Sequence, residues 1–341
     1  MTSTHVDAGA EARPSCVTIA LAGDTMLGRG VADRLESVPR ASLFSPDVVA
    51  AVREADLVVL NLECCVSARG ERWDDPAKPF FFRAPPAAVD ALAHLDVDCV
   101  TLANNHALDY GAVALVDTLE LLHGAGIETV GAGADIDEAR RPAVLETNGF
   151  RLRVVGVTDH PEEYTAGPRT PGVALARLGQ EFPDWLAAAV SDVDADAVLV
   201  TPHWGPNMTD RPLPRIRKAA AQLLDAGATV VAGHSAHVFH GVAGPVLYDL
   251  GDFVDDYATD RYLRNDLGLL FLVTLEGSEV ARIEGVPLKL EYCHTRIADG
   301  ADAAWIRHRL RRACAHFGTG VDDQNGRLVV EAARVATPRF P

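Results

Sequence analysis

Short apolar runs rich in β-branched residues recur along the chain and alternate with segments of helical character. The runs are 17–22, 56–60, 98–103, 151–157, 197–201 and 228–232. The segments of helical character are 85–94, 112–123, 182–191 and 215–226. Strands that are apolar on both faces must be covered on both sides, and helices are the usual cover. The alternation therefore predicts an α/β fold in which helices lie on the faces of a buried sheet.

The pattern changes after Gly251. Two longer runs at 268–277 and 279–293 predict antiparallel strands that complete the sheet system, and a helix near 302–317 follows them. No internal repeat, low-complexity tract or linker divides the chain, so we expect one domain over residues 16–341. Residues 1–15 are small and polar, which predicts a flexible N-terminal tail.

Composition narrows the class of protein. Hydrophobic residues make up 48% of the 341 residues, which is enough for a sizeable core. The formal net charge of −17 and the lack of a basic stretch argue against a nucleic-acid partner. We expect no membrane span and no export signal, because the chain has neither a long apolar run nor a basic segment followed by an apolar one. The six cysteines form no C-x-x-C pair, which favours reduced thiols in a cytoplasmic protein.

Residues that can bind a metal follow several of the apolar runs directly. They are Asp24, Glu63, Asn105, His203, His234 and His237. In α/β folds, ligands gather at the carboxyl ends of the strands. Carboxylate, amide oxygen and imidazole groups suit divalent ions such as Mn, Fe or Zn. The placement therefore predicts a site for one or two divalent metal ions.

Each cluster also has a simpler interpretation. An aspartate such as Asp24 after Gly23 is typical of a turn, and 104–106 is typical of a helix N-cap. His234 and His237 favour a metal site more strongly, because two imidazoles three residues apart after a glycine can converge on one ion. His240 extends that spacing and fits either a structural histidine or one that supports the metal ligands. The simpler interpretations weaken when the clusters are taken together, since all of them fall at predicted strand ends.

A metal site of this kind suits hydrolysis. A bound divalent ion lowers the pKa of water to about 7, and two ions can hold the attacking and the leaving oxygen. His106 lies three residues before Asp109, whose carboxylate could orient the imidazole as an acid for the leaving group. The predicted catalytic residues are therefore His106 and Asp109.

A set of short motifs occurs in a distinctive order between Val17 and Phe253. The motifs are GDTML, NLE, FRAPP, LANNHALDYG, HWG, GHSAH and YDLGDF. Their order resembles that of the CapA-type poly-γ-glutamate capsule synthesis family, which is related to the calcineurin-like metallophosphoesterases. The resemblance implies a metallophosphatase-like four-layer sandwich, in which two mixed β-sheets are flanked by helices.

The resemblance also implies roles for individual residues. Asp24 and His237 would bind a first metal, and Glu63 would bridge the two ions. The second metal would be bound by Asn105, His203 and His234. His106 would be the acid, oriented by Asp109. The expected substrate-binding residues are Asn104, Arg83, Lys78 and His240, with Arg83 and Lys78 as anion-binding candidates near the mouth of the site.

Two departures from the family's pattern are present. Metallophosphoesterases commonly begin with Asp-x-His, whereas Asp24 is followed by Thr25 and Met26. The first metal site therefore lacks one imidazole, and it is either weak or completed by water. The family's YSLGNF-like segment is YDLGDF here, which introduces Asp249 and Asp252. For most of the acids in this region a solvated acidic face is the simplest interpretation. Those acids are Asp249, Asp252, Asp255, Asp256 and Asp260.

These observations lead us to expect a metal-dependent hydrolase that acts on a phosphoester or acyl centre of a small-molecule, phosphorylated or glutamyl substrate. Among enzymes, the alternative is cleavage or transfer at a γ-glutamyl amide. The alternative to an enzyme is an accessory protein of poly-γ-glutamate biosynthesis without phosphatase activity. The incomplete motif at 24–26 favours that last interpretation, and the intact histidines favour catalysis.

Overall fold

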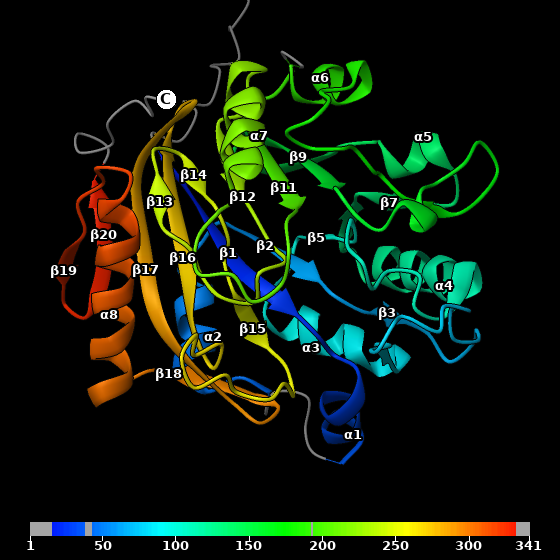
Figure 1. Cartoon of the computed structure of the whole chain (residues 1–341), viewed down its shortest axis with the longest axis horizontal. Coiled ribbons are helices and arrows are strands. Elements are labelled where there is room, and N and C mark those ends of the chain that lie inside the picture. Colours follow the sequence, from blue (N-terminus) through cyan, green and yellow to red (C-terminus); the bar gives the residue numbers. More distant parts are fainter. Residues whose placement is uncertain (1–15, 38–42, 192–193, 332–341) are drawn as a thin grey trace, which may run out of the picture.

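The computed structural model describes residues 16–37, 43–191 and 194–331, so the predicted tail at 1–15 lies outside the described residues. Two large sheets lie face to face, with helices on their outer sides (Figure 1). Both sheets contain parallel and antiparallel neighbours. The expected α/β four-layer sandwich of two mixed β-sheets flanked by helices is therefore confirmed.

The first sheet has ten strands within the described residues, and β1 lies at its centre. On one side of β1 (Val17–Thr25) lie the parallel strands β2 (Leu57–Leu62), β5 (Cys99–Thr101) and β6 (Glu128–Val130). On the other side lie the antiparallel strands β16 (Leu267–Glu276), β17 (Glu279–Glu291), β20 (Arg327–Glu331) and β19 (Asp322–Gln324). Two short strands complete the sheet: β15 (Asp252–Val254), parallel to the end of β1, and β18 (His294–Ile297), which pairs with β17.

The second sheet has six strands among the described residues. Its parallel centre consists of β9 (Phe150–Thr158), β11 (Ala197–His203), β12 (Val230–Ala232) and β14 (Val246–Leu247). Antiparallel edge strands are β8 (Ala143–Thr147) and β13 (Val242–Ala243). Two small sheets lie apart from these: β3 (Cys65–Val66) with β4 (Arg83–Ala84), and β7 (Ala132–Gly133) with β10 (Gly172–Val173).

Helices cover the outer face of each large sheet (Figure 1). The helices that pack with the first sheet are α1 (Arg29–Ser37), α2 (Pro46–Val52), α3 (Val89–His94) and α4 (Gly111–Gly124). Those that pack with the second sheet are α6 (Asp184–Val190) and α7 (Pro214–Asp225). The remaining helices are α5 (Ile136–Ala139), α8 (Gly300–Ala315) and the 3-10 turns η2 (Pro86–Ala88) and η3 (Glu162–Tyr164).

Both faces of the central strands are covered, and this explains the uninterrupted apolar runs in the sequence. Ile19 and Leu21 of β1 face Leu199 of β11 in the core between the sheets. Ala20 points the other way and packs with the helices that cover the first sheet. Successive side chains of a strand point to opposite faces, so a strand buried on both sides needs an uninterrupted apolar run. The six runs in the sequence meet this need.

One glycine allows β15 to approach the end of β1. A Cβ atom on Gly23 would lie 1.9 Å from the carbonyl oxygen of Gly251, so no other residue fits there. The amide of Asp24 donates a hydrogen bond of 2.8 Å to the same carbonyl oxygen. As a result, Asp24 and Asp252 are neighbours in register on two parallel strands.

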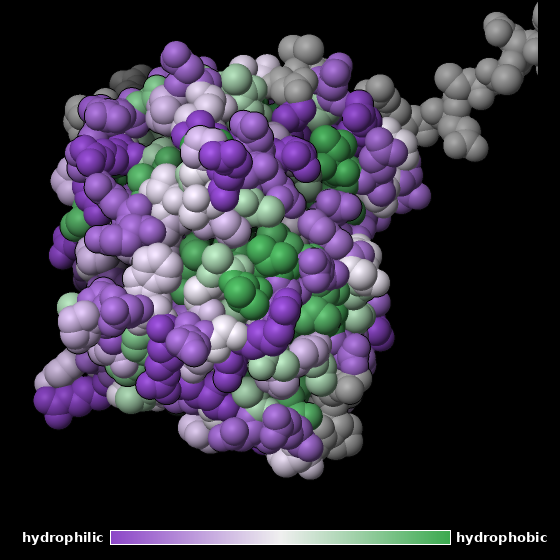
Figure 2. All heavy atoms as spheres, turned by 90° about the vertical axis from the view of Figure 1, so that its right-hand side faces the viewer, coloured by the Kyte–Doolittle hydropathy of each residue, from purple (hydrophilic) through white to green (hydrophobic). Residues whose placement is uncertain are grey.

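The surface is largely hydrophilic on the face shown in Figure 2, with hydrophobic residues gathered mainly near its middle. Among the described residues, no helix has the length and apolar character needed to cross a membrane. The six cysteines are free, and five of them are buried.

Candidate metal centre

Strand ends from both sheets bring six acidic and imidazole side chains together. Each of them is at most 8% exposed. They come from β1, the end of β2, the end of β11, the loop after β12, and β15. The residues are Asp24, Glu63, His203, His234, His237 and Asp252. Five of them are metal ligands expected from the sequence, and Asp252 was not among the expected ligands.

Two carboxylates lie in the middle of the cluster, and each faces imidazoles on two sides. Asp24 Oδ1 is 3.2 Å from His234 Nδ1, and Asp24 Oδ2 is 3.2 Å from His237 Nδ1. Glu63 Oε1 is 4.0 Å from His203 Nε2, and Glu63 Oε2 is 3.9 Å from His237 Nδ1. The cluster therefore has a His237 side and a side formed by His203 and His234, with both carboxylates shared between them.

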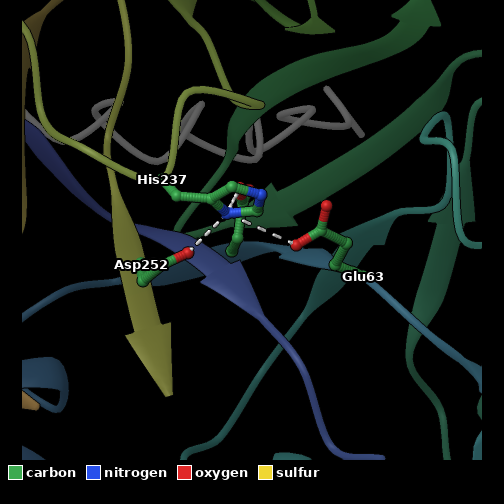
Figure 3. Close-up of side chains that lie close together, drawn as sticks. Glu63, His237 and Asp252 are labelled. Carbon is green, nitrogen blue, oxygen red and sulfur yellow. Dashed lines mark hydrogen bonds and ion pairs between the residues drawn. The ribbon is translucent and has the colours of Figure 1, made fainter. Parts of the chain in front are cut away.

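Asp252 completes the His237 side. Its Oδ1 is 2.9 Å from His237 Nδ1, and Figure 3 shows this carboxylate and that of Glu63 pointing to the same imidazole. Ligand atoms of Asp24, Glu63, His237 and Asp252 lie within 4.8 Å of one another. Two ligands held at about 2.1 Å from one ion lie at most about 4.2 Å apart, so the contacts of 2.9, 3.2 and 3.9 Å made by His237 Nδ1 are compatible with a divalent ion.

Buried atoms without hydrogen-bond partners support this fit. In the described part of the chain they include Asp24 Oδ2, Glu63 Oε1 and Asp252 Oδ2 from the carboxylates. The same set contains His203 Nδ1, His234 Nδ1 and the side-chain oxygen of Asn105. A buried polar atom without a partner is costly, and a bound cation would reduce that cost for the groups that lie in the cluster.

The charge balance of the cluster points to the same conclusion. Burial raises the pKa of Glu63 well above its ordinary value, and the nearby carboxylate of Asp24 adds to this. Burial also raises the pKa of Asp252, against the effect of His237. Burial by itself would lower the pKa of His237, but the carboxylates of Asp252 and Glu63 outweigh it and the pKa is raised. One imidazolium cannot balance the buried carboxylates of Asp24, Glu63 and Asp252, whereas a divalent cation would add the missing positive charge.

His203 already has the protonation state that metal binding needs. Burial lowers its pKa well below the ordinary value, although Asp24 acts in the opposite direction. The ring is therefore neutral at neutral pH and keeps a lone pair for a ligand. For Asp24, burial would raise the pKa, but the adjacent imidazoles of His234 and His237 outweigh burial and lower it.

The loop that carries His234 and His237 has an unusual backbone, with φ of 109° at Ser235 and 58° at His237. Neighbouring groups fix this conformation. Asp249 accepts hydrogen bonds from the amides of Ala236 (2.8 Å) and Gly251 (2.9 Å). Asp249 thereby ties the histidine loop to the segment that contains Asp252.

The acidic region after β14 differs from the expectation of a mainly solvated face. Asp249, Asp252 and Asp255 are 2%, 1% and 6% exposed, so three of its five acids are buried. Asp252 faces His237, and Asp249 accepts backbone amides. The sequence interpretation was wrong here, because it treated the segment as a loop on the surface, whereas strand pairing with β1 places it inside.

A chain of amides links the cluster to the next strand end. Asn61 donates from Nδ2 to Asp24 Oδ1 (2.7 Å) and accepts from Asn104 Nδ2 (2.9 Å). Asn104 Nδ2 also donates to the Leu62 carbonyl, and its Oδ1 accepts the His106 amide. The side chain of Asn104, expected to bind substrate, is thus buried and holds Asn61 and His106 in place.

His106 and Asp109 form a close pair beside the cluster. His106 Nδ1 lies 2.6 Å from Asp109 Oδ2, and Phe82 stacks on the imidazole at 4.0 Å between ring centroids. Lys78 Nζ is 3.0 Å from Asp109 Oδ1, and Tyr164 donates to the same oxygen at 3.2 Å. Burial lowers the pKa of His106 to about 4, although Asp109 opposes this. The imidazole is therefore neutral at neutral pH.

The other expected substrate contacts lie in different surroundings. Lys78 reaches the edge of the centre, where it also donates to the Asn105 carbonyl at 2.7 Å. Arg83 stacks on the Tyr110 ring at 4.1 Å and donates to the carbonyls at positions 69 and 70. His240 donates from Nε2 to the Thr209 carbonyl at 2.9 Å. The structure thus brings Lys78 to the centre but gives Arg83 and His240 partners away from it.

Sequence reasoning also missed residues at the solvent edge of the centre. Tyr257 lies 5.3 Å from His237, measured between ring centroids, and its hydroxyl is 3.5 Å from Glu63 Oε2. The guanidinium of Arg29 lies over the rings of Phe82 and Tyr257, at 4.7 and 5.4 Å from their centroids. No motif marked Arg29 or Tyr257, whereas the missed Asn61 and Asp252 belonged to the NLE and YDLGDF motifs.

Comparisons with known proteins agree with these motifs. Residues 18–257 match the family described as "Bacterial capsule synthesis protein PGA_cap". A "probable polyglutamine synthesis accessory protein" of Mycobacterium tuberculosis is 32% identical over 95% of this chain and 98% of that protein. The "capsule biosynthesis protein CapA" of Bacillus anthracis is 28% identical, covering 81% of this chain and 68% of that protein. The "PGA biosynthesis protein CapA" of Bacillus subtilis is 31% identical, covering 70% and 63% respectively. The chain therefore belongs to the bacterial capsule synthesis family PGA_cap.

Proposed function

We propose that this protein is a metal-dependent hydrolase. One observation carries the proposal: several expected ligands each have a buried atom without a hydrogen-bond partner, and they surround the same small volume. These ligands are Asp24, Glu63, His203 and His234, which contact one another or His237 at 3.2 to 4.0 Å. Buried polar atoms of so many ligand types, left without partners in one place, are characteristic of a functional site.

Two sets of residues would hold the metal. Asp24, Glu63, His237 and Asp252 form the set with the closest spacing. A second ion would be held by His203 and His234 with the shared carboxylates, and the family resemblance adds Asn105. When bound, a divalent ion such as Mn, Fe or Zn supplies a Lewis acid that polarises an ester or amide and lowers the pKa of water.

The chain's own proton-transfer group is His106. With Nδ1 donating to Asp109, the neutral ring presents a lone pair at Nε2. It can accept a proton there while Asp109 stabilises the imidazolium, and it can then return that proton to a leaving group. The role proposed from the sequence, a donor to the leaving group, thus becomes the second half of a two-step transfer.

Phosphoester cleavage is the first chemistry to test, and cleavage at a γ-glutamyl amide is the second. The names of the relatives concern capsule or polyglutamine biosynthesis, which favours glutamyl substrates. They also support a different candidate, an accessory protein of polymer biosynthesis without turnover. The sequence at 24–26, which lacks the usual histidine, favours that candidate, whereas Asp252 on the His237 side favours a complete metal site.

Metal analysis and turnover together test the hydrolase proposal. Protein purified without chelator and reconstituted with Mn, Fe or Zn should contain at least about one equivalent of metal, the occupancy expected of a complete ligand set. It should hydrolyse an aryl phosphate ester or a γ-glutamyl anilide. Metal binding without turnover on either class of substrate would favour the accessory protein, and absence of bound metal would refute both parts of the proposal.

A matched pair of histidine variants tests the role of His106. His106→Ala should reduce kcat by about a hundredfold or more, the usual contribution of a general acid or base, with metal content nearly unchanged. The control is His308→Ala, which removes an exposed imidazole from α8 and should leave kcat unchanged. Loss of metal from His106→Ala would show that the residue is a ligand instead.

A further inference from the structure

A cavity of about 760 Å³ adjoins the His203 side of the metal centre. It lies where two neighbouring strands end: β9 leads into Asp159 and His160, and β11 ends at His203, shortly before Gly205. The ring centroids of His160 and His203 are 5.3 Å apart. The size is typical of small-molecule sites. A molecule in this cavity would therefore contact His160, whose ring adjoins that of the candidate ligand His203.

Charges of both signs line the cavity. Arg215 Nη1 pairs with Asp159 Oδ2 at 2.5 Å, and Arg177 Nη2 pairs with Glu162 Oε1 at 2.8 Å. Asp159 also accepts from His160 Nδ1 at 2.5 Å and from the Gly205 amide at 3.2 Å. Burial by itself would raise the pKa of Asp159. The hydrogen bond from His160 and the charge of Arg215 outweigh burial, so the pKa is lowered.

The two ion pairs differ in how firmly they are held. The side chain of Asp159 is 7% exposed and that of Arg215 is 37% exposed, so Asp159 holds one end of the guanidinium while the rest stays accessible. The side chains of Arg177 and Glu162 are 52% and 62% exposed, and such exposed pairs contribute little to stability. This second pair can separate at little cost when a ligand offers each partner an opposite charge.

We propose that this cavity binds the zwitterionic head group of an amino acid, a carboxylate beside an ammonium group. Arg215, and Arg177 once it separates from Glu162, would bind the carboxylate through paired N–H donors. Glu162 would bind the ammonium. A dianionic phosphate fits less well, because the carboxylates of Asp159 and Glu162 would repel it.

This inference rests on the proposed function and specifies its substrate. A substrate whose head group lies in the cavity would present its other end to the metal centre, so the cavity selects molecules with an ester or amide at a distance from the zwitterion. Glutamine has this layout, with the zwitterion at one end and an amide at the other. It is therefore the simplest probe.

Calorimetric binding to the metal-reconstituted protein tests the proposal. L- or D-glutamine should bind, whereas glutaramate, which lacks the ammonium group, should bind at least about tenfold more weakly, because Glu162 would lose its partner. Arg215→Gln and Arg177→Gln should each weaken glutamine binding by about tenfold or more. The control is Arg211→Gln, which removes a guanidinium that is 73% exposed and pairs with neighbouring Asp210. It should leave binding unchanged.

Several results would overturn the proposal. These are absence of glutamine binding, equal binding of glutaramate, displacement of glutamine by millimolar inorganic phosphate, and unchanged binding by Arg177→Gln. Arg177 is exposed, so its variant stays informative even if Arg215→Gln fails to fold. Glutamine binding that persists in a protein without turnover would refute the hydrolase proposal alone, and turnover without the arginine dependence would refute the cavity proposal alone.

Discussion

Replacement of His240 by glutamine should remove a defined part of the protein's sensitivity to acid. His240 is 4% exposed, its Nε2–H donates to the Thr209 carbonyl, and its Nδ1 is buried without a partner. Burial lowers its pKa to about 4 from 6.5. In the folded protein the ring stays neutral down to that pH, whereas in the unfolded chain it takes up a proton below 6.5. The neutral His240 ring therefore makes its full contribution to the free energy of unfolding above about pH 6.5. This contribution declines as the pH falls from 6.5 to about 4.

The size of this contribution follows from the two pKa values. Between about pH 7 and pH 5, linkage gives a loss of about 2 kcal/mol from this one group. Glutamine can still donate to Thr209 and does not titrate, so His240→Gln should lack this loss. The measurement is the free energy of unfolding in urea for both proteins across this pH range, after chelation, with fluorescence and circular dichroism in agreement. A difference between the two proteins that stays constant with pH would refute the reasoning.

Three further predictions concern the metal centre and its supports. Asp252→Asn should lower the metal content on reconstitution, while Asp260→Asn, in the same acidic region but outside the cluster, should not; equal metal content in both would exclude Asp252 as a ligand. Gly23→Ala should destabilise the fold by several kcal/mol, about 3 or more, because its Cβ would meet the Gly251 carbonyl. Gly124→Ala, where nothing lies within 4 Å, should be neutral or stabilise α4 by up to about 1 kcal/mol, and similar melting temperatures for both alanine variants would contradict this. Chelation should lower the melting temperature of reconstituted protein, whereas an unchanged value would show that the cluster is stable without an ion.

The central strands and most helices could be predicted because their signals are local. The apolar run at 17–22 lies within β1, and the helices predicted at 112–123 and 215–226 correspond to α4 and α7 within two residues at each end. Short elements with weak patterns were missed. The edge strand β8 alternates buried and exposed residues, and α5 spans a single turn.

The candidate site shows the same division between local and distant information. Ligand types at strand ends can be recognised from short motifs, so Asp24, His234 and His237 were expected before the structure. Asp252 could not be recognised in this way, because its role depends on the pairing of β15 with β1. The charged lining of the cavity could not be predicted either, because Arg177 and Arg215 lie on segments that meet only in the folded chain.

The register of β15 against β1 has a consequence for how the protein matures. Asp24 lies in the first described strand, and its neighbour Asp252 follows only after most of the chain. A complete His237 side therefore cannot exist on a nascent chain that lacks β15, and an ion that needs all four of its ligands would bind only after β15 pairs with β1. Because such distant pairings form slowly, an early intermediate would have the buried carboxylate of Asp24 without its full set of partners.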